Sequence, residues 1–154
     1  MIISKGGYSI TTDKNKMDID FIHTFLTRSY WAEGISKEIV ARSVNGSLCF
    51  GVFETNPIAS ASRVGQVGFA RMVTDEATFA YLADVFITED HRKKGLSKWL
   101  MEVIMSHPGL QSLRRILLAT RDAHGLYGQF GFTPLANPER WMQIHDPDVY
   151  KKIN

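Results

Sequence analysis

The sequence has 154 residues and a formal net charge of +2; 44% of its residues are hydrophobic and 22% are charged. This is the composition of an ordinary soluble globular domain, and the mild charge argues against a nucleic-acid-binding protein. No run approaches the roughly 18 apolar residues of a membrane helix, and no secretory signal pattern opens the chain. The single Cys49 excludes an intrachain disulfide, and the histidines lack the spacing of metal ligands. We therefore expect a cytoplasmic protein with no metal site and no membrane partner.

Hydrophobic periodicity and turn residues divide the chain into helices and strands. The pattern predicts a strand at 8–13, helices at 18–29 and 36–45, strands at 47–54, 64–73 and 78–87, a helix at 97–107, a strand at 114–120, a helix at 122–130, a strand at 131–135, and one more strand and a helical turn in the tail. Asp18, Ser36 and Asp122 are expected to cap the helices that follow them. Residues 30–35 are expected to form a loop with two exposed aromatic side chains. This order predicts one domain over residues 1–154, of the α/β or α+β class, with helices around a mixed sheet.

Residues 91–97 join a nearly all-apolar strand to the next helix and have the composition of an anion-binding turn. The first turn of a helix leaves backbone N–H groups without partners, and the helix dipole adds partial positive charge there. Gly95 would let the backbone approach a pyrophosphate closely, and Arg92, Lys93 and Lys94 add charge. Neither the P-loop nor the Rossmann glycine pattern is present. The alternative is that residues 91–97 are the basic, solvated start of a helix. The local chemistry favours neither interpretation over the other.

Two segments of the chain resemble the motifs of the GCN5-related N-acetyltransferases. The family's central motif is a strand, then Arg or Gln-x-x-Gly-x-Gly or Ala, then a helix; residues 92–97 read Arg-Lys-Lys-Gly-Leu-Ser, with serine in the last position. Further along, Ala123, Tyr127, Gly131 and Phe132 match the family's second motif in register. The resemblance implies a mixed, mostly antiparallel sheet flanked by helices. It also implies transfer of an acetyl group from acetyl-CoA to an amine.

The resemblance implies a set of contacts with acetyl-CoA. The turn at 92–97 would hold the pyrophosphate, mainly through backbone N–H groups, and the pantetheine arm would lie along residues 85–87 of the preceding strand. The N–H of Val85 would polarise the thioester carbonyl. Thr120 stands where the family's second motif has asparagine. The residues assigned to the co-substrate are Val85, Phe86, Ile87, Arg92, Lys93, Lys94, Gly95, Leu96, Ser97, Thr120 and Tyr127.

Tyr127 is assigned by motif register as the acid that protonates the departing CoA thiolate. A phenol with a pKa of about 10 is neutral at neutral pH and can donate to a thiolate whose thiol has a pKa of about 8.5. The alternative is that Tyr127 is a packed aromatic residue on a short helix.

The group that deprotonates the amine is less clearly indicated. Histone-type members of the family place a glutamate where this chain has Tyr81, so that base is missing. Asp84 is the one acid within residues 78–87 and is our catalytic candidate, against the alternative of a structural acceptor for backbone or arginine groups. Strand alternation puts Asp84 on the opposite face from Tyr81 and Val85 unless a bulge intervenes. Loss of the amine proton to solvent also stays open.

Aromatic side chains are our candidates for the acceptor side: Tyr30, Trp31, Tyr81 and Trp141. Their faces could bind a cation, although each could instead belong to the core. The expected acceptor is a small amine or a short peptide, and a homodimer stays open. Two other functions remain open: a non-catalytic acyl-CoA sensor on the same fold, and a nucleic-acid or phosphoprotein-binding module that uses the basic residues 91–94.

Overall fold

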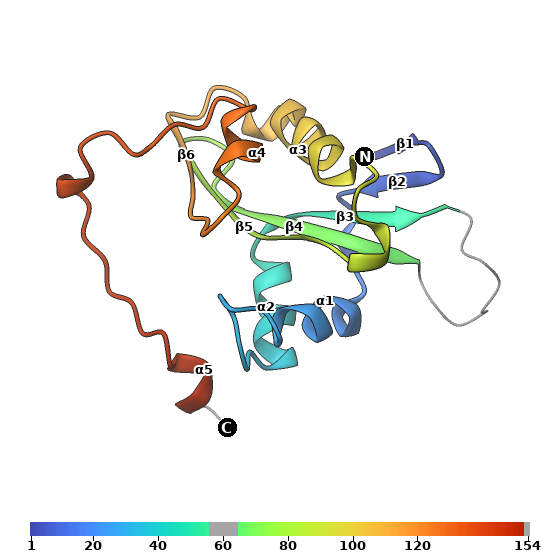
Figure 1. The fold of residues 1–154 in the computed structure, drawn as a ribbon, viewed down its shortest axis with the longest axis horizontal. Coiled ribbons are helices and arrows are strands. Elements are labelled where there is room, and N and C mark those ends of the chain that lie inside the picture. Colours follow the sequence, from blue (N-terminus) through green and yellow to red (C-terminus); the bar gives the residue numbers. More distant parts are fainter. Residues whose placement is uncertain (56–64, 153–154) are drawn as a thin grey trace.

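The computed structural model describes residues 1–55 and 65–152, and its centre is a six-stranded sheet (Figure 1). The strands are β1 (Ile2–Lys5), β2 (Tyr8–Thr11), β3 (Leu48–Glu54), β4 (Gln66–Thr74), β5 (Phe79–Ile87) and β6 (Arg115–Leu118). They lie in the order β1-β2-β3-β4-β5-β6, and all neighbours are antiparallel except β5 and β6, which are parallel. The expected mixed, mostly antiparallel sheet is confirmed. The sequence pattern missed β1, which pairs with β2 as a hairpin through Gly6 and Gly7.

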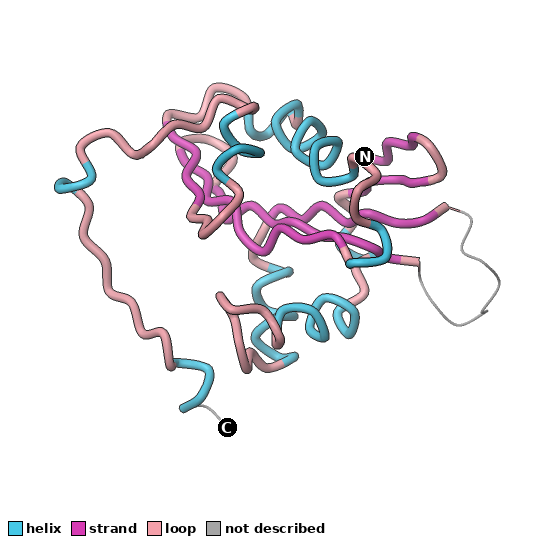
Figure 2. The backbone as a smooth tube through the Cα atoms, viewed as in Figure 1, coloured by secondary structure: helices cyan, strands magenta, loops and turns pink. Residues whose placement is uncertain are grey.

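Helices lie on both faces of this sheet (Figures 1 and 2). They are α1 (Ile19–Leu26), α2 (Lys37–Asn45), α3 (Leu96–Ser106) and the short α4 (His124–Gly128) and α5 (Val149–Lys152). Helices α1 and α2 cover one face, where Ile22, Val40 and Phe69 are buried together. Helices α3 and α4 cover the other, where Val52 and Leu100 belong to the larger apolar cluster. The fold is therefore a single α+β domain with one apolar cluster on each side of the sheet.

The caps predicted for the first two helices are confirmed. Oδ1 of Asp18 accepts a hydrogen bond of 3.0 Å from the N–H of Phe21, and Oγ of Ser36 accepts one of 3.3 Å from the N–H of Ile39. Each cap satisfies a first-turn N–H that has no partner within the helix. Ser36 also marks the end of residues 30–35, which form the predicted loop with exposed aromatic side chains.

The cap predicted for the helix at 122–130 is wrong. The residue that precedes α4 is Ala123, and no side chain caps the helix from that position. The hydroxyl of Thr120 instead accepts a 3.0 Å hydrogen bond from the N–H of Ala123. The start of α4 is thus stabilised by Thr120, three residues before Ala123. Asp122 takes no part in this cap and is exposed.

The strands predicted after residue 130 are also corrected by the structure. No residue from 131 to 152 belongs to a strand, and the strand expected at 131–135 is a turn followed by irregular chain. The tail contains the 3₁₀ turn Pro138–Arg140 and the expected final helical turn, α5. Strand β6 forms as predicted, but it is the last strand of the sheet and half-buried rather than buried.

Residues 55–57 read Thr-Asn-Pro, which predicts a turn, and the mixed residues 58–63 could form a loop or a ragged strand end. Apart from Thr55, these residues lie outside the described part of the chain. Among residues 1–55 and 65–152, no helix has both the length and the apolar character needed to cross a bilayer.

Candidate active site

Strands β5 and β6, the last two strands of the sheet, separate partway along β5. They pair only from Phe79 with Arg115 to Leu82 with Leu118, and β6 ends there. Strand β5 continues to Ile87, paired on its other side with β4. Residues 85–87 therefore have one edge that β6 does not pair, as the predicted path of a pantetheine arm requires.

A β-bulge lies where the two strands begin to separate. The pairing of β4 with β5 shifts register between Phe69 and Arg71, which are opposite Phe86 and Ala83. Asp84 has a φ of 56°, in the left-handed region, so the simple alternation of side chains is broken at this residue. The sequence left a bulge open as the condition that would reorient Asp84, and the structure contains it. Close packing accompanies it, because a Cβ at Gly68 would lie 2.9 Å from the carbonyl oxygen of Phe86.

The first turn of α3 has the backbone geometry expected of an anion cradle. Gly95 precedes the helix with a φ of 75°, and a Cβ there would meet no atom within 4 Å. The first helical bond runs from the N–H of Trp99 to the carbonyl of Gly95, at 3.0 Å. The N–H groups of Leu96, Ser97 and Lys98 therefore have no carbonyl within the helix to bind. Open space beside unpartnered N–H groups is the setting in which a phosphate binds a helix N-terminus.

The basic side chains of this turn have different contacts. Nε of Arg92 donates a 3.0 Å hydrogen bond to the carbonyl of Ile87, which ties the turn to the end of β5. Lys93 adopts a left-handed φ of 63°. Nζ of Lys94 donates to the hydroxyl of Tyr8 at 3.4 Å, and that hydroxyl lies 2.8 Å from Nδ1 of His91.

Tyr8 and His91 thus join the β1–β2 hairpin to this turn. Tyr8, Gly95 and Lys98 line a cavity of about 680 Å³ beside it. Sequence reasoning missed this contact because Tyr8 lies in an ordinary short strand, 83 residues from His91.

Tyr127 lies in α4 with its ring buried against the larger apolar cluster, at 9% exposure. Its ring packs edge-on against Phe132, with the ring centroids 6.1 Å apart. Burial raises the pKa of the Tyr127 phenol above its ordinary value, and the nearby Tyr30 phenol raises this pKa further. The phenol is therefore neutral at physiological pH and able to donate a proton. The packed position and the acid role, which the sequence posed as alternatives, are geometrically compatible.

Asp84 is engaged by two side chains. Oδ2 accepts a 2.5 Å charge-assisted bond from Nε of Arg71, and Oδ1 accepts a 2.9 Å bond from the indole nitrogen of Trp31. Arg71 also donates to the hydroxyl of Ser47 at 3.1 Å. The Asp84 and Arg71 side chains are 8% and 19% exposed, so this ion pair is shielded from solvent. These contacts hold the 30–35 loop against the bulge of β5.

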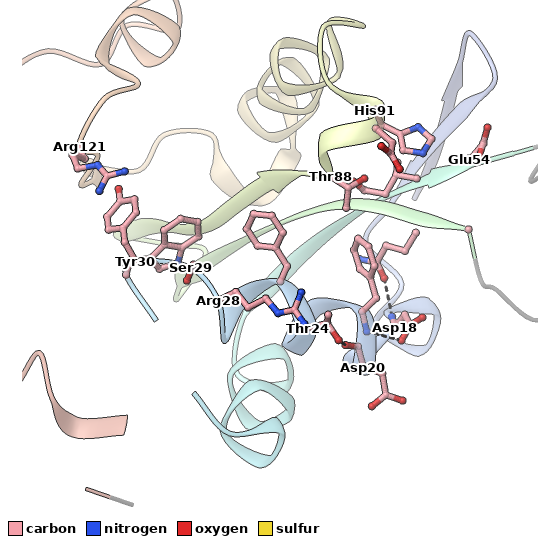
Figure 3. Close-up of a pocket in the computed structure, with 17 residues that line it drawn as sticks. Asp18, Asp20, Thr24, Arg28, Ser29, Tyr30, Glu54, Thr88, His91 and Arg121 are labelled. Carbon is pink, nitrogen blue, oxygen red and sulfur yellow. Dashed lines mark hydrogen bonds between the residues drawn. The ribbon is translucent and has the colours of Figure 1, made fainter. Parts of the chain in front are cut away.

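A groove of about 1030 Å³ lies beside the separated strands (Figure 3). Two predicted acceptor residues, Tyr30 and Trp31, line it. Sequence reasoning missed several other lining residues: Phe21, Phe25, Arg28, Thr88, His91 and Arg121. The helical periodicity of α1 marks Phe21 and Phe25 as apolar positions, but it does not show that they line a groove. Carboxylates also border the groove: Asp18, Asp20, Glu54 and Asp90.

Two aromatic contacts shape this groove. The guanidinium of Arg121 lies over the ring of Tyr30, 3.9 Å from its centroid, and brings the segment after β6 to the 30–35 loop (Figure 3). Phe25 stacks on Phe86 with centroids 3.8 Å apart, which seats α1 on the end of β5. The groove is thus enclosed by parts of the chain that are far apart in sequence.

Two other predicted acceptor residues lie outside this groove. Tyr81 is exposed on the α1/α2 face of β5 and is paired with Val73 and Leu117. Trp141 lies in the tail, with the guanidinium of Arg115 4.7 Å from its ring centroid. Within the described parts of the chain, no cluster of His, Cys, Asp or Glu side chains could hold a metal ion.

Comparisons with known proteins agree with this geometry. The model of the acetyltransferase (GNAT) domain matches residues 49–134, more than half of the chain. A Gibberella zeae protein that carries the name of an acetyltransferase is 30% identical over 139 residues, which span 82% of this chain and 78% of that protein. The crystal structure of a Xanthomonas campestris protein of the GNAT family has a TM-score of 0.86 at 44% identity, covering 96% of this chain and 99% of that chain.

A more distant structure shares the fold alone. N-acetylglutamate synthase from Neisseria gonorrhoeae, complexed with coenzyme A and L-arginine, has a TM-score of 0.65 at 15% identity, covering 96% of this chain and 31% of that chain. The domain match and the closer relatives agree with the separated strands and the glycine turn: the chain belongs to the GNAT acetyltransferase family.

Proposed function

We propose that this protein transfers an acetyl group from acetyl-CoA to a primary amine of a small molecule or short peptide, with residues 1–154 acting as one domain. The GNAT fold implies an acyl-CoA co-substrate and an amine acceptor. The observation that carries the proposal is the unpaired edge of residues 85–87 beside the first turn of α3. N-acetylglutamate synthase, which shares the fold, was crystallised with coenzyme A, and this supports an acyl-CoA co-substrate here.

The first turn of α3 and the end of β5 would hold acetyl-CoA. Backbone N–H groups in residues 93–98 would bind the pyrophosphate, and Gly95 leaves the space for it to approach. Lys94 and Lys98 would add charge from the side chain. The unpaired edge of residues 85–87 would bind the pantetheine arm, and the N–H of Val85 would stabilise charge on the thioester oxygen.

Tyr127 is our proposed general acid. The amine nitrogen attacks the thioester carbon, a C–N bond forms, and the C–S bond breaks. The Tyr127 hydroxyl gives its proton to the departing sulfur and recovers one from solvent. Burial raises the Tyr127 pKa above its ordinary value of about 10, so the phenol is protonated at neutral pH and is available as a donor when the C–S bond breaks. The phenolate that remains is a stronger base than the thiolate, whose thiol has a pKa of about 8.5, and it therefore takes a proton back from solvent.

The attacking amine, in this proposal, loses its proton to water. Asp84 was our candidate base, but both of its oxygens are engaged, one by Arg71 and one by Trp31. These contacts support the structural alternative, in which Asp84 positions the 30–35 loop. The open groove gives water a path to the amine.

The acceptor would enter the groove that Tyr30, Trp31 and Arg121 border. Its size and mixed lining suit a small amine or the end of a short peptide. Calorimetric titration with acetyl-CoA, followed by a thiol-release assay over a panel of primary amines and short peptides, tests the proposal. We expect saturable binding and release of thiol with at least one amine class. Binding without release across the panel would support the non-catalytic sensor instead.

A further inference from the structure

The guanidinium of Arg121 lies against an aromatic ring at one end of the groove. It is 3.9 Å from the centroid of the Tyr30 ring, and both side chains line the groove (Figure 3). Contact with a ring restricts a guanidinium but leaves N–H donors at its edge free, and these donors form the fork that binds a carboxylate with two hydrogen bonds. Because Arg121 is exposed, a ligand in the groove can reach it.

The described part of the chain supplies no anion to this guanidinium. Among residues 1–55 and 65–152, Arg121 takes part in no ion pair of 4.0 Å or less. Carboxylates that border the groove lie elsewhere, since Figure 3 shows Asp18, Asp20 and Glu54 at the other end. An arginine that lines a groove without an anion from its own chain can bind an anionic group of a ligand.

The end of the groove that contains Arg121 is also where the proposed chemistry takes place. Arg121 belongs to the segment that follows β6, and it faces the 30–35 loop across the gap that opens beside β5. In that loop Trp31 donates its 2.9 Å hydrogen bond to Asp84, in the bulge of β5. The phenol of Tyr30 lies near that of Tyr127, whose pKa it helps to raise. An anion bound to Arg121 would therefore lie close to the reacting thioester.

The phosphates of acetyl-CoA have a different set of basic residues available to them. The proposed pyrophosphate site is the first turn of α3, and the cavity beside Gly95 is lined by Lys5, Lys94 and Lys98. Arg121 lines the groove on the acceptor side instead. The anion that suits Arg121 is thus one that the acceptor itself carries.

We propose that the acceptor is a free α-amino acid, whose carboxylate binds Arg121 while its amine attacks the thioester. This inference rests on the proposed acetyltransferase function and adds the class of acceptor to it. The α-nitrogen bonds to the acetyl carbon and loses a proton to water, the C–S bond breaks, and Tyr127 protonates the sulfur. The products are an N-acetyl amino acid and CoA. Because one carbon atom bears both the carboxylate and the amine, binding the first at Arg121 positions the second.

Matched acceptors test the need for a carboxylate. Thiol release is measured for glycine, alanine, leucine, methionine, phenylalanine and lysine, each beside its α-amide, which keeps the side chain and the amine but lacks the charge. A carboxylate raises the pKa of a neighbouring amine, so the amide has the larger fraction of reactive free amine and amine basicity cannot favour the acid. We expect kcat/KM for at least one amino acid to exceed that of its amide by about 10-fold to 100-fold. Amides that react as fast as the acids would overturn the inference and leave the acetyltransferase proposal standing.

Three arginine variants show whether Arg121 is the carboxylate site. Arg121→Gln should raise the KM for the amino acid by about 10-fold to 100-fold, with little change in kcat or in the Kd for acetyl-CoA. Arg115→Gln is the matched control, because Arg115 lies over the ring of Trp141 outside the groove, and it should match the unaltered enzyme. Arg28→Gln removes a positive charge from the same groove and should raise this KM no more than about fivefold.

An unchanged KM in Arg121→Gln would overturn the inference. Equal effects in the Arg28 and Arg121 variants would indicate a general attraction to positive charge and would overturn it as well. Weaker acetyl-CoA binding by Arg121→Gln would assign this side chain to the co-substrate, with the same consequence.

Binding without turnover gives a separate readout. The same amino acids are titrated calorimetrically into protein saturated with CoA, which has no acetyl group to transfer. We expect at least one of them to bind, and to bind Arg121→Gln at least about 10-fold more weakly. If none binds, the inference is wrong even where other amines are acetylated. Amino-acid binding without thiol release from any amine would support the carboxylate site and overturn the acetyltransferase proposal.

Discussion

The indole nitrogen of Trp31 donates a hydrogen bond of 2.9 Å to Oδ1 of Asp84. This bond joins the loop between α1 and α2 to the bulge of β5, at the point where β5 and β6 begin to separate. Arg71 binds the other oxygen of the same carboxylate, so the loop, β4 and β5 are held by one side chain. Asp84 therefore fixes the position of Trp31, which lines the groove, relative to β4 and β5.

Replacing Asp84 with Asn should lower stability more than it lowers the chemical rate. Asparagine tolerates the left-handed φ of 56°, but the shielded Arg71 guanidinium loses its anionic partner. We expect the free energy of unfolding to fall by roughly 1–3 kcal/mol in denaturant titrations. The KM for the acceptor should rise, because the 30–35 loop is less firmly held, while kcat changes little.

The double variant Arg71→Gln/Asp84→Asn provides the control, because it removes both charges and restores much of the lost stability. A fall in kcat of about 10²–10⁴-fold in both variants, with stability restored in the second, would identify Asp84 as the base instead.

Replacing Tyr127 with Phe should lower turnover and leave acetyl-CoA binding intact. The variant keeps the ring that packs on Phe132 and removes only the proton donor. General acid catalysis contributes about 10²–10⁴-fold, so we expect a loss in kcat within that range. Tyr150→Phe, which removes a hydroxyl outside the groove, serves as the control and should match the unaltered enzyme. Equal kcat values for the two variants would rule out the acid role.

The pH dependence of kcat should reflect the raised pKa of Tyr127. The protonated phenol is the active form, so kcat falls only as pH rises through its pKa. Since burial raises that pKa above the ordinary value of about 10, no descending limb should appear below about pH 10. Rates measured at saturating substrates between neutral pH and the onset of unfolding test this. A descending limb near neutral pH would show that another group supplies the proton.

Replacing Gly95 with Val should abolish acetyl-CoA binding while the protein still folds. Valine is strained at a φ of 75°, and its side chain would fill the open space beside the first turn of α3. Gly34→Val is the matched control, because Gly34 has a φ of 83°, a Cβ there would meet only Cβ of Tyr150 at 4.0 Å, and Gly34 does not line the cavity beside Gly95. Calorimetric titration should detect binding to the Gly34 variant only. Normal binding by the Gly95 variant would exclude this turn as the pyrophosphate site.

Cys49 should not react in the native protein. Burial raises the pKa of its thiol to about 11, so almost none of it is thiolate at neutral pH. Iodoacetamide at pH 8 should label the protein only after denaturation, as intact-mass spectrometry would show. Rapid labelling of the native protein would contradict the burial of β3.

The helices and strands were largely predictable because their signals are local. Asp18 and Ser36 cap their helices through residues three positions away, and apolar periodicity marks α3. The failures occurred where local signals compete or depend on distant partners. Asp122 is a residue type that commonly caps helices, but the hydroxyl of Thr120 instead accepts the hydrogen bond from the N–H of Ala123. The tail has a strand-like pattern, but it pairs with no strand among residues 1–55 and 65–152.

By itself the sequence determined the glycine turn and the position of Tyr127, because both depend on contiguous residues whose spacing follows the backbone of one strand–turn–helix unit. The tertiary structure alone decided the groove, the role of Asp84 and the state of the tail. Trp31 and Asp84 are 53 residues apart, and Tyr8 and His91 are 83 apart. Such contacts arise only when the sheet brings its strands together, and the bulge that turns Asp84 toward Trp31 is a property of the paired strands, not of β5 alone.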